Sequence, residues 1–127
     1  MGHSYKDLIV WQKAKSLAVE IYRRPDSFPK TETYGLTVQL RRAAVSVASN
    51  IAEGQGRLTS GEFLQFLGHS RGSLLELQTQ LAISLELNYI SAEQLKALEE
   101  RSSEVLRLLN ALIESLRAKA AGASSGA

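Results

Sequence analysis

One stretch of the sequence, residues 39–81, constrains the fold more than any other. It begins as a segment rich in Ala, Val and Ser, passes Gly54 and Gly56, and continues as a leucine-rich segment. Residues 59–62, Thr-Ser-Gly-Glu, form a capping box, in which a hydroxyl and a carboxylate satisfy the free amides at a helix start. The stretch therefore predicts two closely packed helices that meet at a glycine-marked turn.

Apolar periodicity predicts two further helices, one on each side of this pair. Apolar residues recur at three- and four-residue spacing from Leu8 to Ile21 and from Leu95 to Leu116, as in amphipathic helices. Pro25 ends the first of these helices, and a second capping box at residues 91–94 opens the last. Short connections favour antiparallel neighbours, so we expect an all-α, up-down-up-down four-helix bundle. The expected helices cover about residues 7–24, 33–53, 60–87 and 92–119.

The composition limits the class of protein. At 127 residues the chain is expected to form one domain over residues 1–119, followed by a disordered low-complexity tail at 120–127. It contains no cysteine, which excludes a disulfide framework and thiol catalysis. No apolar stretch approaches the roughly 18 residues that cross a bilayer, and the N-terminus lacks the apolar core of a signal peptide. We therefore expect no membrane partner and a cytoplasmic location.

The sequence shows no recognisable catalytic or metal-binding pattern. His69 has no carboxylate or histidine four residues away, whereas a metal site in a bundle needs Glu-x-x-His pairs on facing helices. Gly54 and Gly56 follow a helix, whereas a phosphate-binding loop follows a strand. We therefore expect a non-enzyme without metal or cofactor, with His69 at the surface or at an interface.

Polar residues follow one side of the expected second helix. Arg42, Ser46 and Asn50 are spaced by four residues, and Glu53 follows three residues later, which places all four on one face. In an antiparallel hairpin Arg42 would lie near Glu76, so we expect either a charge-assisted pair or two separately solvated charges. A second polar line follows the third helix. The structural or oligomer-interface candidates on these two lines are Ser46, Asn50, Glu53, His69, Glu76 and Gln80.

The basic residues are concentrated in the first part of the chain. Residues 1–75 contain ten Lys/Arg and six Asp/Glu (a balance of +4), whereas residues 76–127 contain five and seven (−2). Such an excess can hold phosphates without reading bases, or it can be a solvated surface with no polyanionic partner. Aromatic residues for base stacking are scarce, because Trp11 and Tyr22 are expected in the core or at an interface. The candidate nucleic-acid-binding residues are Lys13, Lys15, Arg23, Arg24, Arg41, Arg42, Arg57 and Arg71.

Several short motifs, taken in their order and spacing, resemble a known family. They are Tyr5-Lys6-Asp7-Leu8 with Trp11, Tyr34-Gly35-Leu36, Gln39 to Ala44, Ser49 to Gly54, Glu62-Phe63, Phe66-Leu67, and Arg71-Gly72-Ser73 with Leu74, Glu76, Leu77 and Gln80. The family is that of the bacterial four-helix-bundle proteins encoded in intervening sequences of large-subunit ribosomal RNA genes. The accessory variability proteins of diversity-generating retroelements belong to the same broad group. Ala48 departs from the pattern, which often has a proline there, so a family-specific kink is not expected.

The resemblance implies a bundle that assembles into a homopentameric ring. Its retroelement branch implies a basic ring that binds a reverse transcriptase and nucleic acid, whereas its ribosomal branch has no established activity. Arg41, Arg42 and Arg71 match motif positions, but the match does not say which of them touches a ligand. Two functions stay open. One is a non-enzymatic oligomeric accessory factor that contacts RNA or DNA backbone; the other is a protein–protein scaffold whose cations are used in pairs with its thirteen acidic residues.

Overall fold

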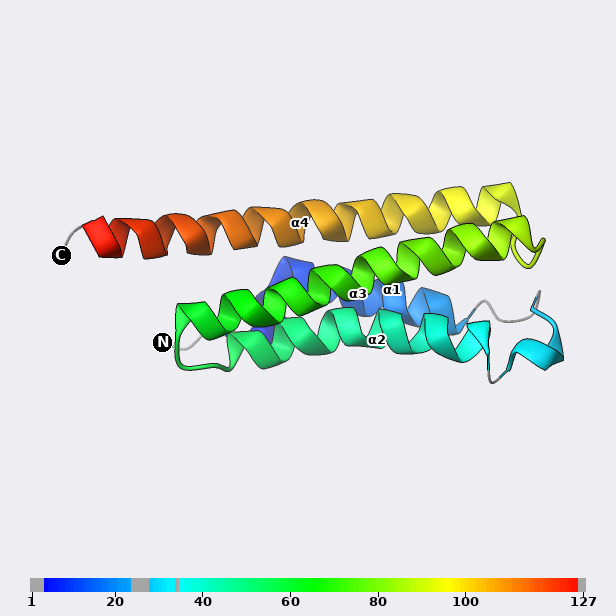
Figure 1. Ribbon diagram of the computed structural model, residues 1–127, viewed down its shortest axis with the longest axis horizontal. Helices are drawn as coiled ribbons and strands as arrows, with labels where there is room; N and C mark the ends of the chain where they lie inside the picture. The colour runs from blue at the N-terminus through cyan, green and yellow to red at the C-terminus, as the bar shows by residue number, and fades with distance from the viewer. Residues whose placement is uncertain (1–3, 24–27, 34, 126–127) are drawn as a thin grey trace.

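The computed structural model describes residues 4–23, 28–33 and 35–125. Within them lie four α-helices, two short 3-10 helices at Tyr5–Asp7 and Lys30–Glu32, and no strand. α2 packs mainly against α3, and α1 packs against both α2 and α4, which closes the bundle. Neighbouring helices run antiparallel (Figure 1). The predicted all-helical architecture is therefore confirmed, with helices α1 (Ile9–Tyr22), α2 (Leu36–Gln55), α3 (Ser60–Glu86) and α4 (Ala92–Ser125).

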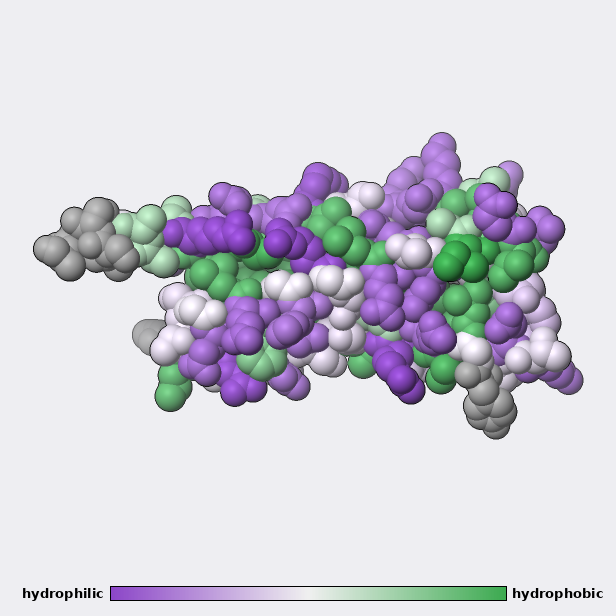
Figure 2. All heavy atoms as spheres, in the orientation of Figure 1, coloured by the Kyte–Doolittle hydropathy of each residue, from purple (hydrophilic) through white to green (hydrophobic). Residues whose placement is uncertain are grey.

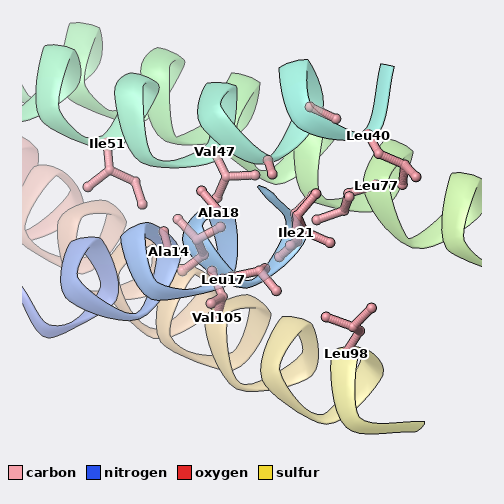
Figure 3. Packing of buried hydrophobic residues seen from close by; sticks show 14 of the residues in the cluster. Ala14, Leu17, Ala18, Ile21, Leu40, Val47, Ile51, Leu77, Leu98 and Val105 are labelled. Atoms are coloured by element: carbon pink, nitrogen blue, oxygen red, sulfur yellow. The ribbon is translucent and has the colours of Figure 1, made fainter. Parts of the chain in front are cut away.

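The core lies along the middle of the bundle, where all four helices contribute side chains (Figure 3). Leu17 of α1, Val47 and Ile51 of α2, Leu77 of α3 and Val105 of α4 are at most 1% exposed. Complete burial of an aliphatic side chain of this size contributes about 1.5–3 kcal/mol. The central positions of the predicted apolar stripes are confirmed, and they fix how the helices face one another.

α1 begins later than predicted. The Ser4 hydroxyl accepts a hydrogen bond from the Lys6 amide at 3.1 Å and caps the first 3-10 helix. Leu8 then takes an extended conformation (φ −74°, ψ 123°), so the α-helix begins at Ile9 instead of residue 7. It ends at Tyr22, and the predicted end at residue 24 lies outside the described residues.

α2 does not stop before Gly54, as the glycine pattern predicted, but continues to Gln55. Gly54 is buried because α3 crosses it closely: a Cβ at this position would lie 2.7 Å from the Phe66 Cβ and 2.9 Å from the Phe63 Cδ1. Gly54 therefore permits helix packing, and the helix ends at the next glycine, Gly56.

Side-chain caps define the other helix starts. In the predicted box before α3, the Thr59 hydroxyl accepts from the Glu62 amide at 3.1 Å. Before α4, the Ser91 amide donates to the Gln94 side-chain oxygen (2.8 Å), and the Gln94 amide donates to the Ser91 hydroxyl (3.1 Å). α2 starts three residues later than predicted, because the Glu32 carboxylate accepts from its first amide at 3.1 Å.

α4 extends beyond its predicted end at residue 119 and reaches Ser125. It projects past the ends of α2 and α3 (Figure 1). Its last turns are rich in alanine, the strongest helix former, so helix propensity continues the helix where packing has ended. The structure thus differs from the expected disordered tail over residues 120–125. No helix in the described part of the chain has the length and apolarity needed to cross a membrane.

Candidate functional site

An open groove of about 510 Å³ lies between α1 and α2. Small side chains, including Ala18, Ala48 and Ala52, line its bottom, where the two helices approach each other. Val19 and Val45 line it from opposite helices, and each is 41% exposed although both are apolar. The groove is an apolar surface that the chain itself leaves uncovered. Its aromatic lining residues are Tyr5, Trp11 and Tyr22.

Two cations rest on aromatic rings of this groove. The Lys15 Nζ lies 5.1 Å from the centre of the Trp11 ring, and the Arg41 Cζ lies 4.7 Å from the centre of the Tyr22 ring. Arg41 also donates from Nη2 to the Tyr22 carbonyl oxygen at 3.3 Å. Cation–π contacts at exposed sites contribute about 0.5–1 kcal/mol. Lys15 therefore lines the groove itself, and Arg41 lies beside it in an adjoining hollow that shares Tyr22 and Val45 with the groove.

Arg23 and Arg42 add two further positive charges. Arg23 lines the groove, and Arg42 lines the same adjoining hollow as Arg41. Among the described residues, none of the four cations has a carboxylate partner. The Arg41 Nε is buried and has no acceptor within the same residues. We call this set the basic rim; it consists of Lys15, Arg23, Arg41 and Arg42.

Three of the remaining predicted cations do not join the basic rim. Lys13 lies on the side of α1 that faces α4 and pairs with Glu104 at 3.5 Å. Arg71 donates to an asparagine side chain of α4 at 3.0 Å, and Arg57 covers a phenyl ring of α3 at 4.4 Å. Arg24 lies outside the described residues. The structure thus brings together four of the eight candidates and places Lys13, Arg57 and Arg71 elsewhere.

Two residues of the predicted polar line, Ser46 and Asn50, belong to a seam between α2 and α3 within one chain. The Ser46 and Ser73 hydroxyl oxygens are 2.8 Å apart, and the Asn50 Nδ2 donates to the Ser46 carbonyl and hydroxyl oxygens at 2.8 and 2.9 Å. The buried Ser70 donates to the Val47 carbonyl oxygen at 2.7 Å. We call these contacts the α2–α3 seam. They satisfy these groups without a second chain.

The ion pair considered between Arg42 and Glu76 is absent, although both residues are described. Both side chains are exposed, and Glu76 accepts from the Gln80 Nε2 at 3.2 Å instead. Arg42 and Glu76 are therefore two separately solvated charges. Gln80 is buried, and its Oε1 has no donor among the described residues. Glu53 and His69, the other interface candidates, are exposed.

A polar contact outside the groove joins the two loops at the end of the bundle where α3 leads into α4. The Tyr89 hydroxyl donates to the Glu32 Oε2 at 2.9 Å, and the Phe28 ring lies 5.3 Å from the Tyr89 ring. The hydrogen bond to Glu32 raises the pKa of Tyr89 above its ordinary value. Within the described residues, no three potential metal ligands come together.

The sequence interpretation missed the groove as a site. It assigned Trp11 and Tyr22 to the core or an interface, and it did not consider Val19 and Val45. A signal was present, because these two valines lie beside the buried stripes of α1 and α2 and not on them. Apolar residues displaced from a core stripe indicate a second contact surface.

The fold and the groove define a small all-helical bundle protein with an open, positively charged face. The chain belongs to the family of 23S rRNA-intervening sequence proteins, whose family model matches residues 6–111. This finding confirms the ribosomal branch of the resemblance.

The fold is also similar to the crystal structure of a protein with unknown function from the S23 ribosomal protein family of Bacteroides thetaiotaomicron VPI-5482. The two share 23% sequence identity with a TM-score of 0.77, over 83% of this chain and 98% of the other. This similarity shows the shared fold. None of the curated proteins matches the chain.

Proposed function

We propose that this protein is a non-enzymatic, homo-oligomeric accessory factor that binds the backbone of RNA or DNA through its basic rim. The observation that carries the proposal is the convergence of four cations from α1 and α2 without a carboxylate partner among the described residues. Lysine and arginine that neutralise phosphates release counterions and bind without sequence readout. The rim is chemically suited to such contacts.

The same geometry argues against base-specific binding. Lys15 and Arg41 already lie against the Trp11 and Tyr22 rings, so these rings are partly covered where a base would stack. Binding should therefore depend on phosphate spacing and salt more than on sequence. A homopentamer, as the family resemblance implies, would repeat the rim around a ring and strengthen its field.

A protein–protein scaffold is the second candidate, and the apolar bottom of the groove favours it. Alanines and exposed valines suit a packed protein side chain better than a phosphate. In this alternative the rim cations pair with acidic groups of a protein partner. A reverse transcriptase is the partner implied by the retroelement branch of the resemblance.

A fluorescence anisotropy titration with labelled structured RNA at low salt tests the proposal. The informative variant is Arg23→Gln with Arg42→Gln, because both side chains are exposed and neither has a partner among the described residues. The matched control is Lys13→Gln, which removes a cation that Glu104 already neutralises. We expect about tenfold or greater loss of affinity in the double variant and little change in the control. Absence of RNA binding by an intact wild-type oligomer would reject the proposal in favour of the scaffold.

A further inference from the structure

A second apolar surface lies on the outer face of α3. Leu75 and Ile83 are 48% and 45% exposed, although both are large apolar residues. Gly68, Gly72 and Thr79 lie on the same side of the helix, at three- and four-residue spacing, and are also exposed. In the view of Figure 2, hydrophobic patches on the side of α3 and α4 alternate with polar surface. We call this face the α3 ridge; it consists of Gly68, Gly72, Leu75, Thr79 and Ile83.

No packing contact within the chain requires the glycines of the α3 ridge. A Cβ at Gly68 or at Gly72 would meet no atom within 4 Å, whereas a Cβ at Gly54 would collide with α3. A glycine inside a helix costs about 0.5–1 kcal/mol relative to alanine. Because Gly68 and Gly72 have no side chain, the backbone of another helix can approach α3 closely at these two positions.

Shape makes the α3 ridge and the groove complementary. The groove is concave, with alanines at its bottom, and the ridge is a single convex helix face with two glycines. Helices pack when the side chains of one fit into the grooves of another. Both surfaces are apolar, and each is left uncovered by its own chain.

Charge makes them complementary as well. The groove and the hollow that adjoins it carry the four positive charges of the basic rim, whereas exposed Glu76 and Glu86 flank the α3 ridge. The one arginine of α3, Arg71, is directed to Asn110 of α4. Docking of the ridge in the groove would bring two carboxylates to four cations.

We propose that the α3 ridge of one copy docks in the α1–α2 groove of a second copy. The two surfaces belong to different helices, so the contact is heterologous, and a copy whose groove is filled still offers its own ridge. Repetition of the contact builds a ring or a filament. This inference rests on the homo-oligomer part of the proposed function. It leaves two of four rim cations per contact for phosphates, so assembly and RNA binding are compatible.

Complementation between two variants tests the contact. Val45→Glu places a carboxylate in the groove, and Gly72→Glu places one on the α3 ridge. Both replace a residue by a better helix former at an exposed position, so each fold should be retained. Because both new groups are negative, the two altered surfaces repel each other in a mixture. Only the intact ridge of the first variant and the intact groove of the second can then combine.

We expect the wild type to assemble and each variant to have the native mass of a single 13.9 kDa chain. The equimolar mixture should form a one-to-one dimer, measured by native mass spectrometry or sedimentation. Val19→Glu and Ile83→Glu should reproduce the groove and ridge results, and circular dichroism verifies folding. Leu58→Glu, at a 98% exposed position in the α2–α3 loop, is the control and should retain the wild-type mass.

A wild type that stays monomeric as its concentration is raised, variants that keep the wild-type mass, or a mixture that stays monomeric would each overturn the proposed contact. All these masses are measured without RNA. Loss of RNA binding in an intact assembly would contradict the proposed function and leave the contact standing.

Discussion

The two sides of α2 differ in how completely the chain satisfies them. On the side of α3, the Ser46 and Ser73 hydroxyls meet at 2.8 Å, and Ser70 donates to the Val47 carbonyl oxygen at 2.7 Å. On the side of α1, apolar Val45 remains 41% exposed, and the rim cations have no carboxylate partner among the described residues. One side of α2 therefore has its polar groups hydrogen-bonded within the chain, whereas the other side leaves apolar and charged groups exposed and available to a binding partner.

This difference separates residues that serve the fold from residues available for binding. Buried polar groups almost always have hydrogen-bond partners within the native structure, and the α2–α3 seam follows that rule. An apolar groove with uncompensated charges at its edge is characteristic of a surface that another molecule covers. Variants in the seam should change stability, and variants at the groove should change assembly and binding.

The largest stability effect is expected from Leu74→Ala. Leu74 is fully buried between the helices, and truncation of a buried leucine costs about 2–5 kcal/mol of unfolding free energy. Leu75→Ala, one residue along, removes the same atoms from a 48% exposed site and should cost the isolated chain less than about 1 kcal/mol. Urea unfolding measures both. Equal losses would show that the two faces of α3 are not distinct.

Gly54→Ala should have the next largest effect, because the new methyl group would lie 2.7 Å from the Phe66 Cβ. Insertion of an atom into a packed contact costs about 1–3 kcal/mol. Gly72→Ala is the matched control, since its Cβ meets nothing within 4 Å, and it should stabilise the isolated chain by about 0.5–1 kcal/mol. A stabilising Gly54→Ala would contradict the close α2–α3 packing.

Arg41→Gln changes the groove side of α2. It removes the contact with the Tyr22 ring and the hydrogen bond to the Tyr22 carbonyl oxygen. The expected loss of stability is only about 0.5–1 kcal/mol, whereas RNA affinity should fall in proportion to the lost charge. A large loss of stability with unchanged RNA affinity would place Arg41 among the structural residues.

The smallest effect is expected from Tyr89→Phe, which removes the hydrogen bond to Glu32 at the loop end of the bundle. The folded state holds the phenolic proton more tightly, because the pKa of Tyr89 is raised. The contribution is thus present below the ordinary tyrosine pKa of about 10 and is lost as pH rises through the raised value. Thermal melts of both proteins should converge above that pH; a constant difference would contradict this cause.

Much of the fold followed from the sequence. Apolar spacing predicted the four helices, and the capping boxes before α3 and α4 placed their starts within one residue. The end of α2 was predicted wrongly because a glycine near the end of a helix can either terminate that helix or allow a second helix to pack closely against it. Only the position of the Phe66 side chain decides between these tasks for Gly54.

The candidate site was less predictable, because helical periodicity assigns a face but not the neighbour of that face. Lys13 and Lys15 are two residues apart, about 200° around the helix. One therefore pairs with Glu104 of α4, while the other lies on the Trp11 ring in the groove. The sequence analysis assigned both lysines to one candidate site, but helix packing places them on opposite faces of α1.

The salt dependence of RNA affinity shows whether the groove side of α2 is the side that binds phosphates. Because assembly leaves two rim cations per copy, a complex that spans two copies neutralises four phosphates, which predicts about a 20- to 50-fold loss of affinity for a threefold rise in salt. In the Arg23→Gln, Arg42→Gln variant, the slope of log affinity against log salt should be shallower by about 1.5, and in Lys13→Gln it should be unchanged. Equal slopes for the wild type and the rim variant would show that the phosphates are held elsewhere and that the basic rim is not the binding surface.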